Sequence, residues 1–261
     1  MDKRFLEILT IKPQLITDFP SWMLPEPVVG ELRSIDNVAI AEIAGRDSIA
    51  AAIEAVRTRR FEAVLPTIAY TGTEFGEWGY PFEKADFLKA RLDDEGVRVF
   101  QPVVLGAPEF WWKLNGRYAT HLSKTYGFYT PCVGCHLYFH AIRIPIAKRI
   151  GCRCIIGGER ESHDGRTKIN QVDVVLDEYA RFMSAFDIEL LLPLRYIQSG
   201  ERIEQIIGQS WEEGGEQLKC VMNKNYLDQH GHVDYSEENM KRFLSEFALK
   251  VAEEEVQKLL K

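Results

Sequence analysis

Three cysteines stand at positions that suit metal or sulfur chemistry. Cys132 and Cys135 form a Cys-X-X-Cys pair, and Cys220 follows Lys219 far downstream. Two thiolates at the first spacing can face the same metal ion or iron–sulfur cluster, and a neighbouring lysine favours the thiolate form of a cysteine. The pair is therefore a candidate metal site, and Cys220 is a candidate thiolate.

Other interpretations of the pair stay open. They are a zinc site completed by His136 or His140, a redox dithiol, and cysteines that are simply buried. The two histidines lie one turn apart on the helix expected after the pair, where polar packing explains them equally well. Cys152 and Cys154 share a face of an expected strand, and we expect both in the core. Five cysteines, an odd number, fit a reducing compartment better than a disulfide framework.

The turn at residues 44–48 could bind a phosphate. It follows a β-branched and small apolar run that begins at Val38, and it precedes an Ala-rich helix that ends near Arg57. A strand, a turn of small residues and a helix N-terminus point free N–H groups and the positive end of a helix dipole at one place, which favours phosphate. An ordinary connection capped by Asp47 or Ser48 explains the pattern equally well.

Another polar segment, residues 157–171, carries cationic side chains that could neutralise a phosphate. These candidates are Arg160, Arg166 and Lys168. The alternative is a solvated loop in which they pair with Glu159, Glu161 and Asp164.

The same segment holds polar residues for which two roles are open. Asn170 and Gln171 suit recognition of a base or an amide, or they cap the helix that follows. His163 is either an acid–base group or an exposed loop residue.

Strands alternate with helices along most of the chain, which predicts parallel βαβ units. We expect strands from Val38 and over 61–70, 97–105, 152–156 and 188–196, with Pro66 marking an edge or a bulge. Expected helices span 82–95, 132–150, 173–186, 200–208 and 236–261. The predicted fold is α/β, a doubly wound parallel sheet with helical additions. Ligands bind at the carboxyl ends of such strands, where the polar segments 44–48, 71–76 and 157–171 would meet.

Three regions divide the chain. Residues 1–36 contain four prolines, which predict an arm with little regular structure beyond a first short helix. Residues 37–227 form the α/β domain, and 228–261 a C-terminal helix that packs on the body or on another subunit. The aromatic-rich stretch 107–130 is either a base-stacking platform or, as we favour, core.

Composition excludes some classes of protein. The 261 residues are 46% hydrophobic and 27% charged, as in globular enzymes. A net charge of -7, from 32 Lys and Arg against 39 Asp and Glu, disfavours a general nucleic-acid binder but allows a local basic patch. No apolar run approaches a membrane span and the N-terminus lacks a signal-peptide core. We expect a cytoplasmic protein.

Three motifs together resemble one superfamily. Residues 43–48, Ile-Ala-Gly-Arg-Asp-Ser, resemble a degenerate Ser-Gly-Gly-X-Asp-Ser loop of the PP-loop ATP pyrophosphatases, with Ile43 and Ala44 replacing its first Ser and Gly. Residues 68–77 are similar to the Asp-Thr-Gly-X-X-Phe-Pro-Glu segment of the phosphoadenylylsulfate reductase branch. Cys132, Cys135 and Cys220 resemble the three cluster ligands of PP-loop sulfur-transfer enzymes. The resemblance covers residues 37–227.

The resemblance implies a fold of the HUP, adenine nucleotide alpha-hydrolase-like type and an ATP-dependent sulfurtransferase. ATP with Mg²⁺ would adenylate a carbonyl of a nucleotide base or small metabolite, and a sulfur nucleophile would then displace AMP. The implied catalytic residues are Asp47, Arg160, Arg166 and Lys168. The implied nucleotide contacts are Ala44, Gly45, Arg46, Ser48, Tyr70, Thr71, Gly72, Gly158, Glu159 and Asn170. A [4Fe-4S] cluster would be held by Cys132, Cys135 and Cys220, with zinc as the alternative.

Two other functions stay open. A phosphoadenylylsulfate reductase-like oxidoreductase is favoured by the Thr71-Gly72 loop, although Cys220 lacks the Glu-Cys-Gly-Leu-His setting of those enzymes. A non-catalytic nucleotide-binding protein is the other, with Ile43 and Ala44 marking lost catalysis. The expected partners are a small-molecule or nucleotide substrate, ahead of tRNA, a sulfur-donor protein and further copies of this chain.

Overall fold

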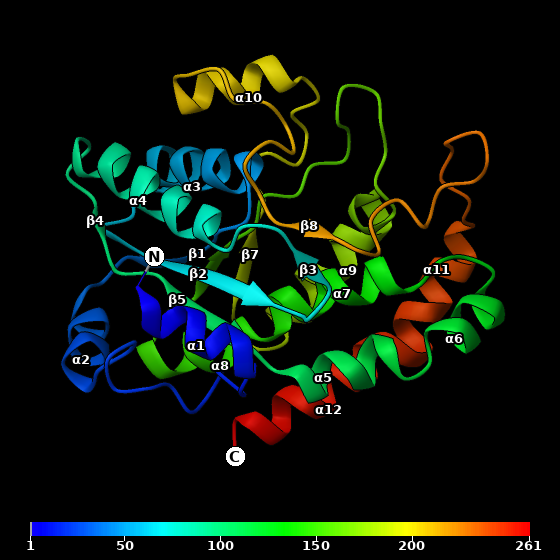
Figure 1. Cartoon of the computed structure of the whole chain (residues 1–261), viewed down its shortest axis with the longest axis horizontal. Helices are drawn as coiled ribbons and strands as arrows, with labels where there is room; N and C mark the ends of the chain where they lie inside the picture. The colour runs from blue at the N-terminus through cyan, green and yellow to red at the C-terminus, as the bar shows by residue number, and fades with distance from the viewer. Residues whose placement is uncertain (1) are drawn as a thin grey trace.

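The computed structural model describes residues 2–261 and has a parallel sheet at its centre (Figure 1). The order is β4-β2-β1-β6-β7, with β5 also pairing with β2, and every pair in this sheet is parallel. Its strands are β1 (Val38–Glu42), β2 (Ala63–Tyr70), β4 (Arg98–Val99), β5 (Val103–Gly106), β6 (Cys154–Ile156) and β7 (Glu189–Leu191). The predicted α/β fold class is confirmed.

The strand order reverses between β1 and β6. The chain moves outward from β1 through β2 to β4 and β5, and outward on the other side from β6 to β7. The carboxyl ends of β1 and β6 therefore border the crevice in which doubly wound sheets bind ligands.

Helices cover both faces of the sheet. Figure 1 shows α3 (Arg46–Arg59), α4 (Gly79–Asp93) and α10 (Gly200–Ile207) above it, and α8 (Arg143–Ile150) and α12 (Leu249–Leu259) below. The other helices are α1 (Lys3–Ile11), α2 (Glu26–Ser34), α5 (Pro108–Trp111), α6 (Ala119–Tyr126), α7 (Pro131–Ala141), α9 (Asp173–Ser184) and α11 (Glu237–Phe243). Short helical turns span Trp112–Gly116, Ile169–Gln171 and Leu244–Ala248, and β3 (Glu74–Phe75) pairs antiparallel with β8 (Lys219–Cys220). No described helix is both long and apolar enough to cross a membrane.

Pro66 does not mark an edge or a bulge, because β2 lies inside the sheet. The Thr67 carbonyl accepts from the amide of Ile43, just beyond the end of β1, so the backbone groups of Thr67 point toward β1. Those of Pro66, one residue earlier, therefore point toward the neighbouring strand on the other side of β2. That neighbour is interrupted between β4, which ends at Val99, and β5, which begins at Val103. The missing N–H of Pro66 thus faces a gap in the ladder.

The expected third strand and fourth helix are each two elements. The strand predicted over 97–105 is β4 and β5, and the helix predicted over 132–150 is α7 and α8. Pro145 lacks the N–H that would pair with the carbonyl of Ala141, which is the last residue of α7. The fifth strand is also shorter than 188–196, because the chain turns after Leu191.

The N-terminal arm contains a second helix that the prolines concealed. Pro25 is the N-cap of α2 and Pro27 lies in its first turn. Proline is tolerated there because the N–H groups of a first turn have no carbonyl partner within the helix. The aromatic stretch is core only in part: Phe110, Tyr126 and Phe128 are buried, but Trp112 and Tyr118 are exposed. Cys152 and Cys154 are buried, as predicted.

The arm is attached where β5 ends. Leu15 and Gly106 exchange both backbone hydrogen bonds, and the Tyr70 hydroxyl donates to the carbonyl of Pro13. A Cβ on Gly106 would overlap the Tyr70 ring. Gly106 is therefore required where the arm, β2 and β5 meet.

The substitution Gly106→Ala should lower the free energy of unfolding by about 1–3 kcal/mol, because it forces a methyl group against the packed ring of Tyr70. Gly30→Ala is the matched control, since its Cβ would meet nothing within 4 Å inside α2. It should stabilise the protein by about 0.5–1 kcal/mol. Urea unfolding of both variants measures this. Equal effects would show that the contact between Tyr70 and Gly106 does not hold the arm.

Candidate functional site

The turn between β1 and α3 is held by a single hydroxyl. Ser48 Oγ accepts from the amides of Ala44, at 3.0 Å, and Gly45, at 3.2 Å, and donates to the Gly45 carbonyl at 2.8 Å. The amides of Arg46, Asp47 and Ser48 begin the helix and have no intrahelical acceptor. These three N–H groups, rather than those of Ala44 and Gly45, are the ones that an anion could bind.

Gly158 lets the ends of β1 and β6 come together. A Cβ at this position would lie 2.7 Å from both the amide nitrogen and the Cα of Ser48. The loop after β6 is therefore packed directly on the first turn of α3, and Gly158 acts by allowing this approach.

Asp47 joins two buried arginines. Its Oδ1 lies 3.0 Å from Arg46 Nε and its Oδ2 lies 2.9 Å from Arg160 Nε. Arg46 is 5% exposed and Arg160 is fully buried. Because both guanidinium groups are desolvated, Asp47 fixes their orientation beside the helix N-terminus.

A second carboxylate, Glu213, lies in the middle of this cationic group. It belongs to the segment 209–217 that follows α10. The nitrogens nearest to it are Arg166 Nη2 at 2.7 Å, His163 Nδ1 and Lys168 Nζ at 3.2 Å, Arg46 Nη2 at 3.7 Å and Arg160 Nη2 at 3.9 Å. Four cationic side chains against the two carboxylates Asp47 and Glu213 leave an excess of positive charge.

The charges in this group shift pKa values. The close approach of His163 holds the pKa of Glu213 well below its usual range, with help from the charge of Lys168. Burial lowers the pKa of Lys168, against the opposing effect of Glu213. The lowered pKa of Glu213 shows that the surrounding side chains stabilise a negative charge at this place.

The expected ion pairs of this loop are wrong. Arg160, Arg166 and Lys168 pair with Asp47 and Glu213. The acids of their own loop have other partners: Glu161 pairs with Arg195, Asp164 accepts from the amide of Gly200, and Glu159 faces two histidines. Nothing in the sequence near Glu213, apart from the turn-forming pair Gly214-Gly215, signals its role.

His163 and Gln171 are buried rather than exposed or capping. His163 Nε2 lies 2.5 Å from Gln171 Oε1, which also accepts from the amide of Arg160 at 3.4 Å. The helix α9 begins after Val172 without a side-chain cap, so neither Asn170 nor Gln171 caps it. Asn170 is 5% exposed, and its Nδ2 has no partner among residues 2–261.

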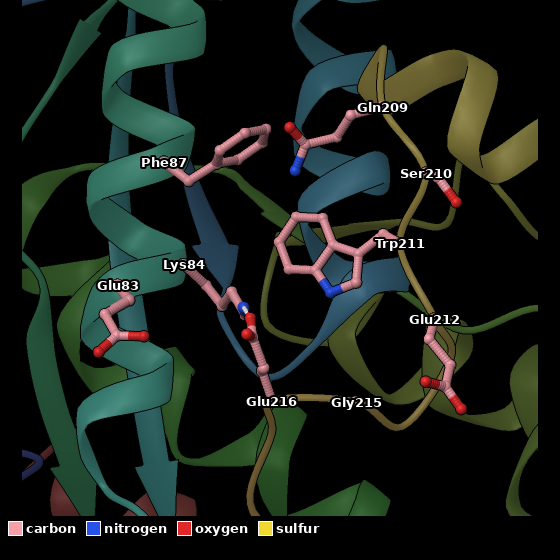
Figure 2. Close-up of a pocket in the computed structure, with 9 residues that line it drawn as sticks. All are labelled: Glu83, Lys84, Phe87, Gln209, Ser210, Trp211, Glu212, Gly215 and Glu216. Atoms are coloured by element: carbon pink, nitrogen blue, oxygen red, sulfur yellow. Dashed lines mark hydrogen bonds and ion pairs between the residues drawn. The ribbon is translucent and has the colours of Figure 1, made fainter.

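A pocket of about 470 Å³ adjoins the cationic group (Figure 2). It lies between α4 and the segment 209–217, with Trp211 at its centre and Lys84 and Phe87 facing it from α4. Lys84 Nζ lies 4.3 Å from the centroid of the Trp211 ring and 3.0 Å from a Glu216 oxygen. The Trp211 carbonyl accepts from Arg46 at 3.3 Å, so one residue borders both the pocket and the cations. The sequence interpretation missed this pocket.

The loop after β2 faces the cysteines. Glu74 accepts from the amides of Thr71, at 2.8 Å, and Gly72, at 2.9 Å, so these predicted nucleotide contacts are already bound. Thr73 Oγ1 lies 3.4 Å from Cys220 Sγ. The Tyr70 side chain is buried toward the N-terminal arm and offers nothing to the crevice.

Cys132, Cys135 and Cys220 converge on one side of the molecule. Cys132 Sγ lies 4.0 Å from the carbonyl oxygen of Met222, whose amide donates to Cys220 Sγ at 3.4 Å. Cys135 Sγ accepts from the indole of Trp111 at 3.3 Å. Burial raises the pKa of Cys132 to about 12 and that of Cys135 well above its usual value. These thiols are neutral until a cation or cluster binds them.

The histidines do not complete a zinc site with the cysteines. His136 Nδ1 and His140 Nε2 lie 3.2 and 3.1 Å from the same oxygen of Glu159. Although burial would raise the pKa of Glu159, the neighbouring His140 and the hydrogen bond with His136 hold it well below its usual range. Across residues 2–261, no compact group of metal-ligand atoms combines a histidine with these thiols.

Glu213→Gln gives a test of this charge arrangement. Because folding lowers the pKa of Glu213 below the ordinary value of 4.5, its stabilisation is complete above about pH 4.5 and is lost as the pH falls further. The variant should be less stable than the natural protein at about pH 7, with a smaller difference at about pH 3. Urea midpoints at both pH values measure this, and a difference independent of pH would contradict it.

Comparisons with known proteins place the chain in a family. No family model matches it. The uncharacterized protein MJ0009 of Methanocaldococcus jannaschii is 41% identical over 212 residues, which cover 80% of this chain and 76% of that protein.

Two solved structures show lower similarity. One is a 4-thiouridine synthetase in complex with RNA and bound ATP, with 16% identity, a TM-score of 0.49 and 84% of this chain covered; the chain spans 53% of that protein. The other is the U34-tRNA thiolase NcsA from Methanococcus maripaludis with its [4Fe-4S] cluster, with 12% identity, a TM-score of 0.38, and coverage of 88% and 74%. Both scores lie below 0.5, so they carry no conclusion about the activity. The identity with MJ0009 does carry one about kinship: the chain belongs to the same protein family as MJ0009.

Proposed function

We propose that this chain is an ATP-dependent, AMP-forming sulfurtransferase that thiolates a carbonyl carbon of a nucleotide base or a small metabolite. The observation that carries the proposal is the Glu213 carboxylate held among five nitrogen-bearing side chains at the N-terminus of α3. A site that already binds one anion at the switch point of a doubly wound sheet suits a nucleotide phosphate.

The residues fit a triphosphate. The free amides of residues 46–48 and the side chains of Arg46, Arg160 and Lys168 would bind its oxygens once Glu213 withdraws. Asp47 remains beside the helix N-terminus, and its carboxylate oxygens suit the Mg²⁺ that accompanies a triphosphate. The aromatic and polar lining of the pocket between Phe87 and Trp211 suits the base.

The reaction follows from that placement. The substrate carbonyl oxygen attacks the α-phosphorus of ATP, and pyrophosphate leaves. Hydrosulfide, supplied by a sulfur donor, then attacks the activated carbon, and AMP leaves with the former carbonyl oxygen. Negative charge grows on the phosphate oxygens in the first step, so Arg160 and Lys168 would stabilise its transition state.

The three cysteines fit the remaining chemistry. Cys132 and Cys135 lie on the first turns of α7, and Cys220, at the end of β8, is linked to Cys132 through the backbone of Met222. Their sulfur atoms do not all lie within 4.8 Å of one another, a wider separation than one tetrahedral ion spans. A [4Fe-4S] cluster bound by these three thiolates would supply an iron open to hydrosulfide.

Lys168→Gln tests the phosphate site. We expect it to lower kcat/KM for release of pyrophosphate from ATP by at least about tenfold, because one cation beside the developing charge is lost. Lys148→Gln is the matched control: its side chain is 39% exposed against 36% for Lys168, and it pairs with Asp187 elsewhere. The control should keep the natural rate.

The same assay separates the competing functions. AMP and pyrophosphate in equal amounts support adenylation. ATP that binds without turnover, in the presence of nucleoside, tRNA and metabolite pools, would contradict the enzyme and favour a nucleotide-binding protein. Reduction of an adenylylated sulfate with thioredoxin would identify an oxidoreductase instead.

Cys135→Ala tests the cluster. Protein purified without oxygen should contain about four irons per chain and absorb visible light, and the variant should lose both. Cys154→Ala is the control, because Cys154 is buried in β6 within the core. Colourless protein with one zinc, or with no metal, would contradict the cluster.

A further inference from the structure

A buried group of carboxylates and imidazoles lies at the crevice, apart from the cysteines. Glu42 ends β1, Glu159 follows β6, and His136 and His140 lie one turn apart on α7. Glu42, His140 and Glu159 are 8%, 0% and 1% exposed, and each offers a ligand atom within 4.8 Å of the other two. His136 reaches the same Glu159 oxygen from the rim at 3.2 Å.

Several atoms of this group have no hydrogen-bond partner. No residue among 2–261 makes a hydrogen bond to Glu42 Oε2, Glu159 Oε2 or either ring nitrogen of His140, although Arg143 forms an ion pair with Glu42 Oε2. His140 Nε2 approaches Glu159 Oε1 at 3.1 Å without hydrogen-bond geometry. Burying such polar atoms without partners is costly, so the arrangement calls for a ligand that they share.

The local charge points to a cation. Arg143 is fully buried, and its Nη1 lies 3.4 Å from Glu42 Oε2 and donates to the Phe139 carbonyl, while its Nε donates to Thr67 Oγ1. One guanidinium therefore opposes the two carboxylates Glu42 and Glu159.

The backbone leaves room at this group. A Cβ at Gly157 would overlap Glu159 Oε2 and lie 3.4 Å from the Cε1 carbon of His140. The glycine thus keeps open the space in which the two side chains face each other.

We propose that Glu42, His140 and Glu159 bind one first-row divalent metal ion of the zinc class. One imidazole nitrogen and two carboxylate oxygens are ligands that Zn²⁺ takes in proteins. His136 lies outside this compact group and holds the Glu159 carboxylate from the rim, as an outer partner of a metal-binding carboxylate does. The ion would join α7 to the ends of β1 and β6 and so position the helix that carries Cys132 and Cys135.

Zinc binding without the cysteines tests the proposal. The starting protein carries Cys132→Ala, Cys135→Ala and Cys220→Ala, so that no thiolate of that group competes. After chelator treatment and dialysis with Zn²⁺, it should retain one zinc per chain. With Co²⁺ it should show visible ligand-field bands without a thiolate charge-transfer band.

Adding His140→Gln to this protein should weaken Zn²⁺ binding by at least about tenfold, because a ligand is lost. His121→Gln, on the exposed surface of α6, is the matched control and should bind as before. If His140→Gln does not fold, His136→Gln at the rim, where the side chain is 25% exposed, should also weaken Zn²⁺ binding about tenfold, because His136 positions the Glu159 carboxylate.

Two results would overturn the inference. One is a triple cysteine-to-alanine protein that retains no zinc, and the other is retention that neither His140→Gln nor Glu159→Gln changes. Neither depends on ATP, so failure here is distinguishable from failure of the proposed sulfurtransferase.

Discussion

The close approach of two strand ends governs the structure around the crevice. Gly158 lies directly on the first turn of α3, where any side chain would strike the backbone of Ser48. This contact fixes the loop after β6 against the phosphate-type turn. It thereby brings Arg160 to Asp47 on one side and Glu159 to the histidines of α7 on the other. Two adjacent residues of one loop serve two different polar groups because of it.

Much of the fold could be predicted because it depends on local signals. The alternation of apolar strands with helices predicted the parallel sheet, and glycines or prolines marked most of its boundaries. The wrong predictions concern prolines whose structural effect depends on neighbouring elements of the fold. Pro66 is tolerated inside the sheet because its neighbour is interrupted, which only the pairing of β4 and β5 reveals. Pro145 divides a helix whose apolar pattern continues through it.

The candidate site was predictable only in part, for a related reason. Asp47, Arg160 and Lys168 were identified because they lie on loops at strand ends, and the structure brings them together. Glu213 comes from a distant segment with no periodic pattern, so nothing local indicated its partners. His136 and His140 were considered beside the nearby cysteines, but both imidazoles contact Glu159, which the loop after β6 supplies. Closeness in the sequence therefore suggested the wrong partners for these two histidines, because their contacts depend on the tertiary structure.

The segment that carries Glu213 has a consequence for affinity. A carboxylate joined to the same chain is present at a high effective concentration beside its cations. An incoming anion must compete with it, and its observed dissociation constant equals the intrinsic one divided by the fraction of molecules in which the segment is open. Gln217 of the same segment also covers Gly45, so release would uncover the turn and the cations together. The segment 209–217 would thus act as a tethered competitor of the ligand, and the flexibility of its nine residues would set how tightly the crevice holds that ligand.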